Sequence, residues 1–350
     1  MARLSGPDSH QLFEGAEGSS FGWVNRELIA SGNILEHVNS VGVEDRIWLG
    51  PEGGQFSIFF APGVPFDLEH WFTPAAIDNE PFEIVGQSKS FMAFRRTFSL
   101  TNYSGTQFEV QIDRVVRLLS GEEVWSYPGS EAASGVQVVG FESVNKLTNL
   151  AAENWKEETG LLSHWVLGQF QSSPKTSVIL PIRSGAHAEL GIPVTSDYFG
   201  PVAEDRIVIR EDAVLFKADS NYRSKLGLSL QRAKGVLGSY DGLNHVLTIV
   251  QYAQPAGLEK YVNSAWKIYE YPYKGDVANC YNDGPAAPGK GQLGPFYELE
   301  SSSPARALKP LESVMHVHRT LHLVGTEAEL DAICHKTLGV RLTDVHAFYT

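Results

Sequence analysis

Short runs of aromatic and β-branched residues, each closed by Gly, Pro, Asn, Asp or Ser, recur along almost the whole chain. Examples are FSIFFAPG at 56–63, TSVILPI at 176–182 and HVLTIVQY at 245–252. Runs bounded by turn residues in this way are typical of β-strands, and few of them show the periodicity of an amphipathic helix. The sequence therefore predicts an all-β protein built largely from antiparallel strands, with a few short helices.

Local signals mark one hairpin and one helix. TNYSGT at 101–106 places Asn, Ser and Gly between two β-type runs and predicts a hairpin turn. TEAELDAICHKTL at 326–338 is the best helical pattern, because Thr326 three residues before Glu329 indicates a capping box and Gly339 a stop. We expect a short C-terminal helix over 326–338.

The segment 274–295 is the longest stretch without a strand or helix pattern. It is rich in Gly, Pro, Asn and Asp, and it runs directly into the strand-like FYELESS at 296–302. Irregular loops of this length are uncommon inside compact domains and are often functional. We expect a loop that hangs over a binding site, with a surface linker between two halves as the alternative.

Size, composition and charge bound the domain organisation and the partners. The 350 residues, 43% hydrophobic and 20% charged, suffice for a large core, and long all-β units can fold as one domain. We expect a single domain over 1–350, with residues 1–20 irregular. The formal net charge of −13 disfavours a nucleic-acid partner, and no stretch approaches the roughly 20 apolar residues of a membrane span. The chain fits either a periplasmic or secreted protein whose signal peptide has been removed, or a cytoplasmic one, and it carries no signal for an oligomeric state.

Motifs for nucleotide and thiolate chemistry are missing from the sequence. Cys280 and Cys334 form no CxxC pair, which argues against a disulfide scaffold and a zinc–thiolate site. There is no GxSxG elbow, no GxGxxG fingerprint and no P-loop. The sequence therefore lacks the motifs expected of a hydrolase, a dinucleotide-binding protein or a nucleoside-triphosphate-binding protein. No nucleotide cofactor is expected.

Two strand-like segments carry the residues with the clearest chemical potential. Side chains alternate between the faces of a strand, so His316, His318 and His322 of MHVHRTLHL share one face. Glu298 and Glu300 of FYELESS share a face for the same reason. One of two close glutamates can have a raised pKa and act as a general base, with a histidine as its acid. The alternative for both strands is a solvated polar face.

The histidines also allow a metal site. His316 and His318 have the HxH spacing of two ligands, whereas His322, four residues after His318, lies about 13 Å further along a strand. A site would therefore combine His316 and His318 with a carboxylate from elsewhere. The sequence does not define a cofactor, and a divalent metal is the candidate.

A polar segment and several tryptophans suit the recognition of sugar hydroxyls. In EDRIWLGPEGGQFSIFF at 44–60, Arg46, Glu52 and Gln55 surround a glycine pair, which either lets a ligand approach the backbone or forms a simple turn. The tryptophans that would either stack on a sugar or fill the core are Trp48, Trp71, Trp155, Trp165 and Trp266.

The C-terminal motifs resemble a known superfamily. YELES, a Leu-x-Pro-x-Glu turn at Leu308, Pro310 and Glu312, and the histidine strand that follows resemble the end of aldose 1-epimerases, the galactose mutarotase-like proteins. The epimerase turn has Gly after its Pro; this chain has Leu311, for which a type I turn is expected because Leu disfavours positive φ. Longer segments resemble an uncharacterised bacterial family of that superfamily: SFGWVNRELIASG, EDRIWLGPEGGQFSIFF, TNYSGTQFEV, GDVANCYNDGP, GPFYELESSSPA and HVHRTLHL.

This resemblance covers most of the chain and implies both a fold and a reaction. The implied fold is a large antiparallel β-supersandwich. In the superfamily a glutamate removes the anomeric hydroxyl proton, and Glu300 best matches it, with Glu298 as the alternative on the same face. The superfamily's acid histidine has no counterpart in VNKLTNLAAENW at 144–155, which implies that His316 or His318 replaces it or that the activity differs.

We therefore expect a carbohydrate-active protein, either an aldose 1-epimerase-like enzyme or another sugar-modifying enzyme with a glutamate base, whose partner is a sugar or oligosaccharide. The alternatives are a polysaccharide lyase or glycoside-processing enzyme on the same fold, and a carbohydrate-binding module without catalysis. The expected catalytic residues are Glu300, Glu298, His318 and His316, and the expected substrate-binding residues are Arg46, Glu52, Gln55, Trp71, Asn145, Asn282, Asp283 and Arg319.

Overall fold

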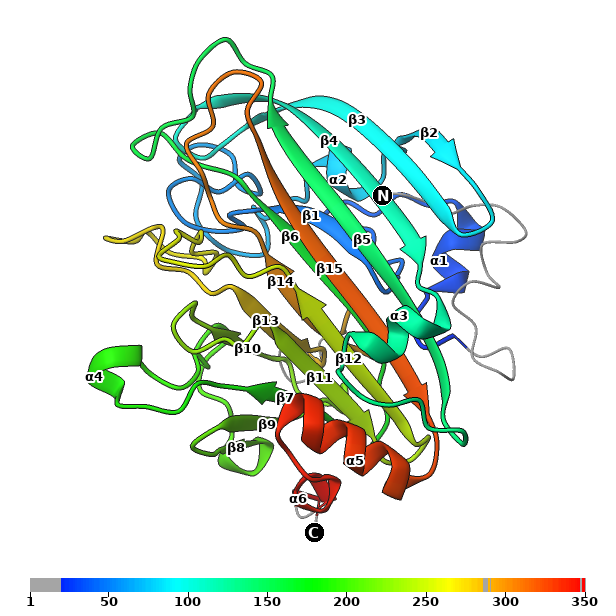
Figure 1. Ribbon diagram of the computed structural model, residues 1–350. Coiled ribbons are helices and arrows are strands. Elements are labelled where there is room, and N and C mark those ends of the chain that lie inside the picture. The colour runs from blue at the N-terminus through cyan, green and yellow to red at the C-terminus, as the bar shows by residue number, and fades with distance from the viewer. Residues whose placement is uncertain (1–19, 286–288, 290, 347, 350) are drawn as a thin grey trace.

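The computed structural model describes residues 20–285, 289, 291–346 and 348–349, and the expectation for residues 1–20 lies almost wholly outside them. Two antiparallel sheets make up most of the fold (Figure 1). The five-stranded sheet has the order β1 (Arg46–Gly50), β6 (Ser163–Gln171), β14 (Phe296–Ser302), β13 (Ala278–Asn282) and β10 (Ser224–Leu228). The ten-stranded sheet has the order β2 (Glu83–Gln87), β3 (Phe91–Thr101), β4 (Gln107–Leu118), β5 (Gln137–Asn149), β15 (Ser313–Val324), β12 (Val246–Tyr252), β11 (Val236–Asp241), β7 (Thr176–Pro181), β9 (Ala213–Lys217) and β8 (Ile207–Ile209). The prediction of an all-β, largely antiparallel fold with few short helices is confirmed.

Leu247 of the ten-stranded sheet packs in one buried cluster with Val124 and Leu330 of two helices, and all the α-helices are short (Figure 1). They are α1 (Arg26–Ser31), α2 (Ala75–Asp78), α3 (Gly121–Ser126), α4 (His187–Leu190), α5 (Glu327–Leu338) and α6 (Leu342–His346), with a 3₁₀ turn at Glu204–Arg206. Helix α5 begins after Thr326, whose side chain and that of Glu329 form the predicted capping box. It ends at Gly339, which has a left-handed φ of 74°. Both helix signals in the sequence are confirmed.

The predicted hairpin at 101–106 joins β3 to β4. Thr101 pairs with Gln107 at the end of the ladder, and Gly105 takes a positive φ of 84°. The Asn102 side-chain oxygen accepts hydrogen bonds from the Thr106 backbone N–H at 2.9 Å and from the Ser104 hydroxyl at 2.8 Å. The turn forms because Asn and Gly supply the side-chain acceptor and the backbone freedom that it needs.

Two segments differ from the sequence prediction. The run 56–63 is largely buried, but it forms only an isolated bridge from Phe60 to Trp71, so its apolar pattern reports burial and not a strand. The segment 274–295 was expected to be a loop, but Ala278–Asn282 within it form β13, which is buried on both faces between β10 and β14. Its two asparagines suggested a loop, but Asn279 faces the polar cleft and Asn282 is buried with its amide bound to the backbone of Ser220 and Tyr222.

The turn before β15 also differs from the prediction. Leu311 adopts a left-handed φ of 66°, where a type I turn with negative φ was expected. The Leu311 N–H donates to the Asn149 carbonyl at 2.8 Å, and the Asn149 N–H donates to the Glu312 carbonyl at 3.0 Å. This pair of backbone hydrogen bonds fixes the turn against the end of β5 and offsets the steric cost of the left-handed leucine.

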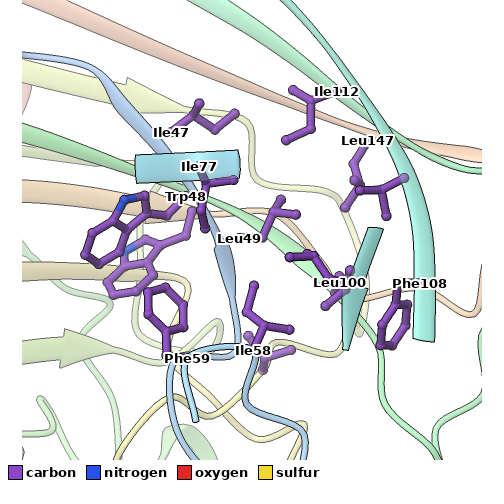
Figure 2. Close-up of a cluster of buried hydrophobic side chains, with 14 of the residues drawn as sticks. Ile47, Trp48, Leu49, Ile58, Phe59, Ile77, Leu100, Phe108, Ile112 and Leu147 are labelled. Atoms are coloured by element: carbon purple, nitrogen blue, oxygen red, sulfur yellow. The ribbon is translucent and has the colours of Figure 1, made fainter. Parts of the chain in front are cut away.

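One hydrophobic core fills the space between the two sheets at their β1 end. Figure 2 shows Ile47 and Leu49 of β1 among side chains from the opposite sheet, including Ile112 of β4 and Leu147 of β5. All four are buried. Because side chains alternate along a strand, Arg46, Trp48 and Gly50 of β1 lie on the other face of the five-stranded sheet. That other face carries the candidate site.

Candidate functional site

A cleft covers the face of the five-stranded sheet that points away from the ten-stranded sheet. Its main cavity has a volume of about 300 Å³. The strands contribute Arg46, Trp48, Trp165, Leu167, Gln169, Tyr281, Glu298 and Lys225, and the surrounding loops contribute Glu52, Trp71, Phe199, Arg223, Trp266 and Asp283. The size lies at the lower end of the range for small-molecule sites, and the mixture of rings with a few polar groups is typical of them.

Four tryptophans form a continuous wall of this cavity. The ring centroids of Trp48 and Trp165 lie 5.4 Å apart, and those of Trp48 and Trp71 lie 6.2 Å apart. Trp71 in turn stacks on Trp266 at 5.9 Å. Flat aromatic faces next to polar groups are suited to the C–H faces of sugar rings. The expectation that Trp71 belongs to the site agrees with its position.

Glu298 is the strand glutamate that lines the cavity. Its Oε1 accepts a hydrogen bond from Gln169 Nε2 at 2.8 Å. Burial, followed by the charge of Glu300, raises the pKa of Glu298 to about 8, although Lys225 opposes the shift. A carboxyl group with a pKa near neutrality is suited to take up and release protons.

Glu300 lies beneath the cavity lining and is fully buried. Its Oε2 accepts hydrogen bonds from Trp165 Nε1 at 2.7 Å and from Lys225 Nζ at 2.8 Å. Burial alone would lower the pKa of Lys225, but the neighbouring glutamates outweigh it and the net shift is upward. Glu300 therefore holds a charged Lys225 and the Trp165 ring in place, whereas Glu298 faces the cavity.

The three residues expected around the Gly53–Gly54 pair have different positions. Glu52 lines the cavity, its Oε1 accepts from Trp266 Nε1 at 3.1 Å, and burial raises its pKa. Arg46 lines the cavity too, forms an ion pair with Asp78 and stacks on Trp48 at 4.8 Å. Gln55 does not contribute to the lining, because its amide donates to the Tyr269 carbonyl at 2.7 Å and accepts from the Tyr269 N–H at 3.0 Å.

His316 and His318 do not line the cleft, and the prediction that they form a wall with the glutamates is wrong. Ser301 Oγ lies 2.7 Å from His316 Nε2 and 2.8 Å from His318 Nδ1, and Ser301 points to the opposite face of β14 from Glu298. Both histidines are fully buried between the sheets. His322 lies there too, 2.8 Å from Glu44 Oε2.

The expected metal site does not fit these positions. One ring nitrogen of His316 and one of His318 already face the Ser301 hydroxyl. Among the described residues, no group of three or more His, Cys, Asp or Glu side chains could hold a metal ion. The histidine pair therefore belongs to the interior packing of the protein.

The buried histidines give the protein a pH-dependent stability. Burial lowers the pKa of His318 to about 4 from an ordinary value of 6.5, and it lowers the pKa of His316 well below that value. The unfolded chain therefore binds more protons than the folded chain between pH 6.5 and 4, and stability falls as the pH falls through this window. For His318 the loss approaches about 3 kcal/mol.

Urea unfolding between pH 7 and 4 measures this loss, and His318→Gln should show a shallower decline than the wild type. The matched control is His187→Gln, since His187 is exposed to water. An equally steep decline in His318→Gln would contradict the assignment.

The remaining predicted binding residues divide into one at the cavity and three elsewhere. Asp283 lines the cavity, accepts hydrogen bonds from the Tyr281 hydroxyl at 2.6 Å and the Gly294 N–H at 2.8 Å, and has its pKa raised by burial. Asn282 is engaged with the backbone of Ser220 and Tyr222. Asn145 is buried against Arg114 and Ser143, and Arg319 forms an ion pair with Glu142. These last three bind protein groups outside the cleft, and their expected role in substrate binding is not supported by their positions.

Several cleft residues escaped the sequence prediction. Gln169, Lys225 and Arg223 line the cavity, and none was selected. Lys225 is the one charge in the strand Ser224–Leu228, and Gln169 follows six residues that lie buried in β6. For Lys225 the available signal was a single charge in a short strand-like run, because burying a charge requires a partner.

The sequence matches the model of a family of unknown function, DUF6786, over residues 11–349. The chain belongs to this family, and the prediction of an uncharacterised family is confirmed. No curated protein matches the sequence. The described residues contain no helix that is long and apolar enough to cross a membrane.

Several solved structures are similar to the chain. A galactose mutarotase-like protein from Lactobacillus casei is 12% identical, with a TM-score of 0.49 over 88% of this chain and 90% of that one. The Slr1438 protein from Synechocystis is 11% identical, with a TM-score of 0.49 over 89% and 86%. A galactose mutarotase related enzyme from Lactobacillus acidophilus is 9% identical, with a TM-score of 0.42 over 87% of both chains. At these values none of the three bears on what this chain binds.

Proposed function

We propose that the protein is a carbohydrate-active enzyme that interconverts the anomers of a reducing sugar in the cleft of the five-stranded sheet. The observation that carries the proposal is the position of Glu298, a carboxyl group with a pKa raised to about 8 that faces a cavity walled by tryptophans. Rings for stacking and a carboxyl group that can accept a proton near neutral pH are two of the parts that this chemistry requires.

The proposed roles follow from the charges around the cavity. Ionised Glu298 takes the proton of the anomeric hydroxyl, while the charged Lys225 ammonium, which also lines the cavity, gives a proton to the ring oxygen, so that the ring bond at the anomeric carbon breaks and an aldehyde forms. Closure on the other face of the aldehyde returns both protons and yields the other anomer. Lys225, which lies among Glu52, Glu298 and Glu300, stabilises the ionised form of Glu298. A carboxylate and an ammonium group therefore supply the base and the acid.

Magnetisation-transfer NMR of anomer exchange tests this function across a panel of reducing sugars that includes glucose, galactose, mannose and xylose. We expect exchange of at least one sugar to be faster than without protein. The rate should rise with pH through about 8, because Glu298 is active only after it loses its proton. In Glu300→Gln the midpoint should move to lower pH, since the charge of Glu300 contributes to the raised pKa of Glu298. Exchange at the rate without protein for every sugar would contradict the proposal.

A sugar-binding protein without turnover is the second candidate. It is favoured by the cleft lining, which contains no histidine among the described residues. In that case calorimetry should detect binding of a sugar whose anomer exchange the protein does not accelerate.

A further inference from the structure

The cleft continues beyond the main cavity into a second lobe. The second lobe has a volume of about 230 Å³ and shares with the first Glu52, Leu68, Trp165, Phe199, Arg223, Lys225 and Trp266. Its own lining includes Gly50, Ser163, Tyr198, Ser264, Asp276, Asn279 and Ser302. The shared residues form a common boundary, so the two lobes are compartments of one site.

The two lobes follow one another along the strands. On β14 Glu298 lines the first lobe and Ser302 the second, and four residues of strand span about 13 Å. On β13 Tyr281, which pairs with Glu298, lines the first lobe, and Asn279, which pairs with Glu300, lines the second. Both strands therefore place the two lobes in the same order along the sheet. Glu300 lies between them on β14, and its partner Lys225 lies at the boundary. This length exceeds that of one pyranose ring.

Hydrogen bonds join polar groups of the second lobe into one network. The Tyr198 hydroxyl donates to Asp276 Oδ2 at 2.6 Å and accepts from Asn279 Nδ2 at 3.1 Å. A Cβ at Gly227 would come within 2.0 Å of Asp276 Oδ2, so the glycine on β10 leaves the space that the carboxyl group occupies. Burial raises the pKa of Asp276. Hydroxyl, amide and carboxyl groups without a surplus of charge are suited to neutral sugar hydroxyls.

Aromatic rings also reach this lobe. Tyr198 and Phe199 lie on one loop, and the Lys225 ammonium is 4.6 Å from the Trp165 ring centroid and 5.8 Å from that of Tyr198. Trp165 and Trp266 are shared with the first lobe, so a stacking surface continues from one lobe to the next. The second lobe therefore repeats the chemistry of the first, with rings beside polar groups.

We infer that the ligand is a disaccharide or longer oligosaccharide, with its reducing sugar in the first lobe beside Glu298 and the adjoining sugar in the second lobe beside Tyr198, Asp276 and Asn279. This inference rests on the proposed function and names its substrate class. A free monosaccharide would fill only the first lobe and would leave the polar network of the second without its ligand.

Calorimetry with matched probes tests the inference: glucose with cellobiose and maltose, and galactose with lactose and β-1,4-galactobiose. In the wild type we expect one disaccharide to bind at least about tenfold more tightly than its matching monosaccharide, the gain from about one well-placed hydrogen bond or stacking contact. Tyr198→Phe and Asn279→Ala should each remove most of this preference. Gln169→Ala, in the first lobe, is the matched control and should weaken both probes while keeping their ratio.

The outcomes separate the inference from the function on which it rests. Binding of a monosaccharide with no preference for any disaccharide overturns the inference and leaves the proposed function standing, as does a preference that survives in both second-lobe variants. Failure of every probe to bind contradicts the proposed function itself. Circular dichroism spectra of the variants show whether they are folded. If Asn279→Ala is unfolded, Tyr198→Phe, which keeps the aromatic ring, still tests whether the second lobe is responsible for the preference for the disaccharide.

Discussion

Replacement of Glu298 by glutamine should lower the rate of anomer exchange by about a thousandfold, since a positioned general base contributes about 10²–10⁴ in rate. The amide keeps the size of the side chain, and its oxygen can still accept the hydrogen bond from Gln169 Nε2, which is 2.8 Å from Glu298 Oε1. The variant should therefore fold normally and bind sugar while losing turnover. Magnetisation-transfer NMR at saturating sugar measures the loss.

Stability supplies an independent readout of the same substitution. Glu298 has an ordinary pKa of 4.5 when unfolded and about 8 when folded, so the folded chain binds more protons in that interval and the wild type loses stability as the pH rises through it. Glu298→Gln should lack this loss and should gain stability relative to the wild type toward pH 8. Glu109→Gln, on the exposed side of β4, is the matched control. Full exchange activity in Glu298→Gln would remove Glu298 from the mechanism.

Replacement of Lys225 by methionine should destabilise the protein by about 3–5 kcal/mol, the cost of leaving a buried charge without its partner. Lys225 Nζ lies 2.8 Å from Glu300 Oε2, and Glu300 is fully buried. Methionine fills similar space without charge, so the loss reports the unpaired carboxylate. Chemical denaturation with urea at pH 7 gives the free energy of unfolding.

A double variant isolates the ion pair from packing. Lys225→Met combined with Glu300→Gln should recover most of the lost stability, because neither partner then carries a charge and the glutamine oxygen can still accept from Trp165 Nε1. Lys260→Met, which breaks the exposed pair with Glu157, should cost less than about 1 kcal/mol. If Lys225→Met is as stable as the wild type, Glu300 is not held by this ion pair.

Local chemistry in the sequence predicted the elements whose causes are themselves local. The Thr326 and Glu329 capping box lies within four residues, and the turn at 101–106 is made by Asn102 and Gly105 within it. By contrast, the polar residues of Ala278–Asn282 suggested a loop, because the strand alternates between an apolar interior and a polar cleft. Of its two neighbours, β14 follows it next along the chain, but β10 comes from a distant part of the chain.

The sequence predicted which side chains of the candidate site share a strand face, but it did not predict how deeply each side chain is buried. Alternation placed Glu298 and Glu300 on one face, but which of them meets the cavity depends on Lys225, which crosses from β10 to engage Glu300. The same alternation grouped His316 and His318. Their burial against Ser301 results from the packing of β15 on β14 of the other sheet, a contact between strands of different sheets that periodicity does not encode.

The most direct test of the central claim is a crystal structure of the protein soaked with a reducing sugar that it binds. The account predicts a sugar ring in the first lobe against the wall of Trp48, Trp71 and Trp266, with its anomeric hydroxyl within hydrogen-bond distance of Glu298. A sugar bound at another surface, with only water in the cleft, would contradict the account.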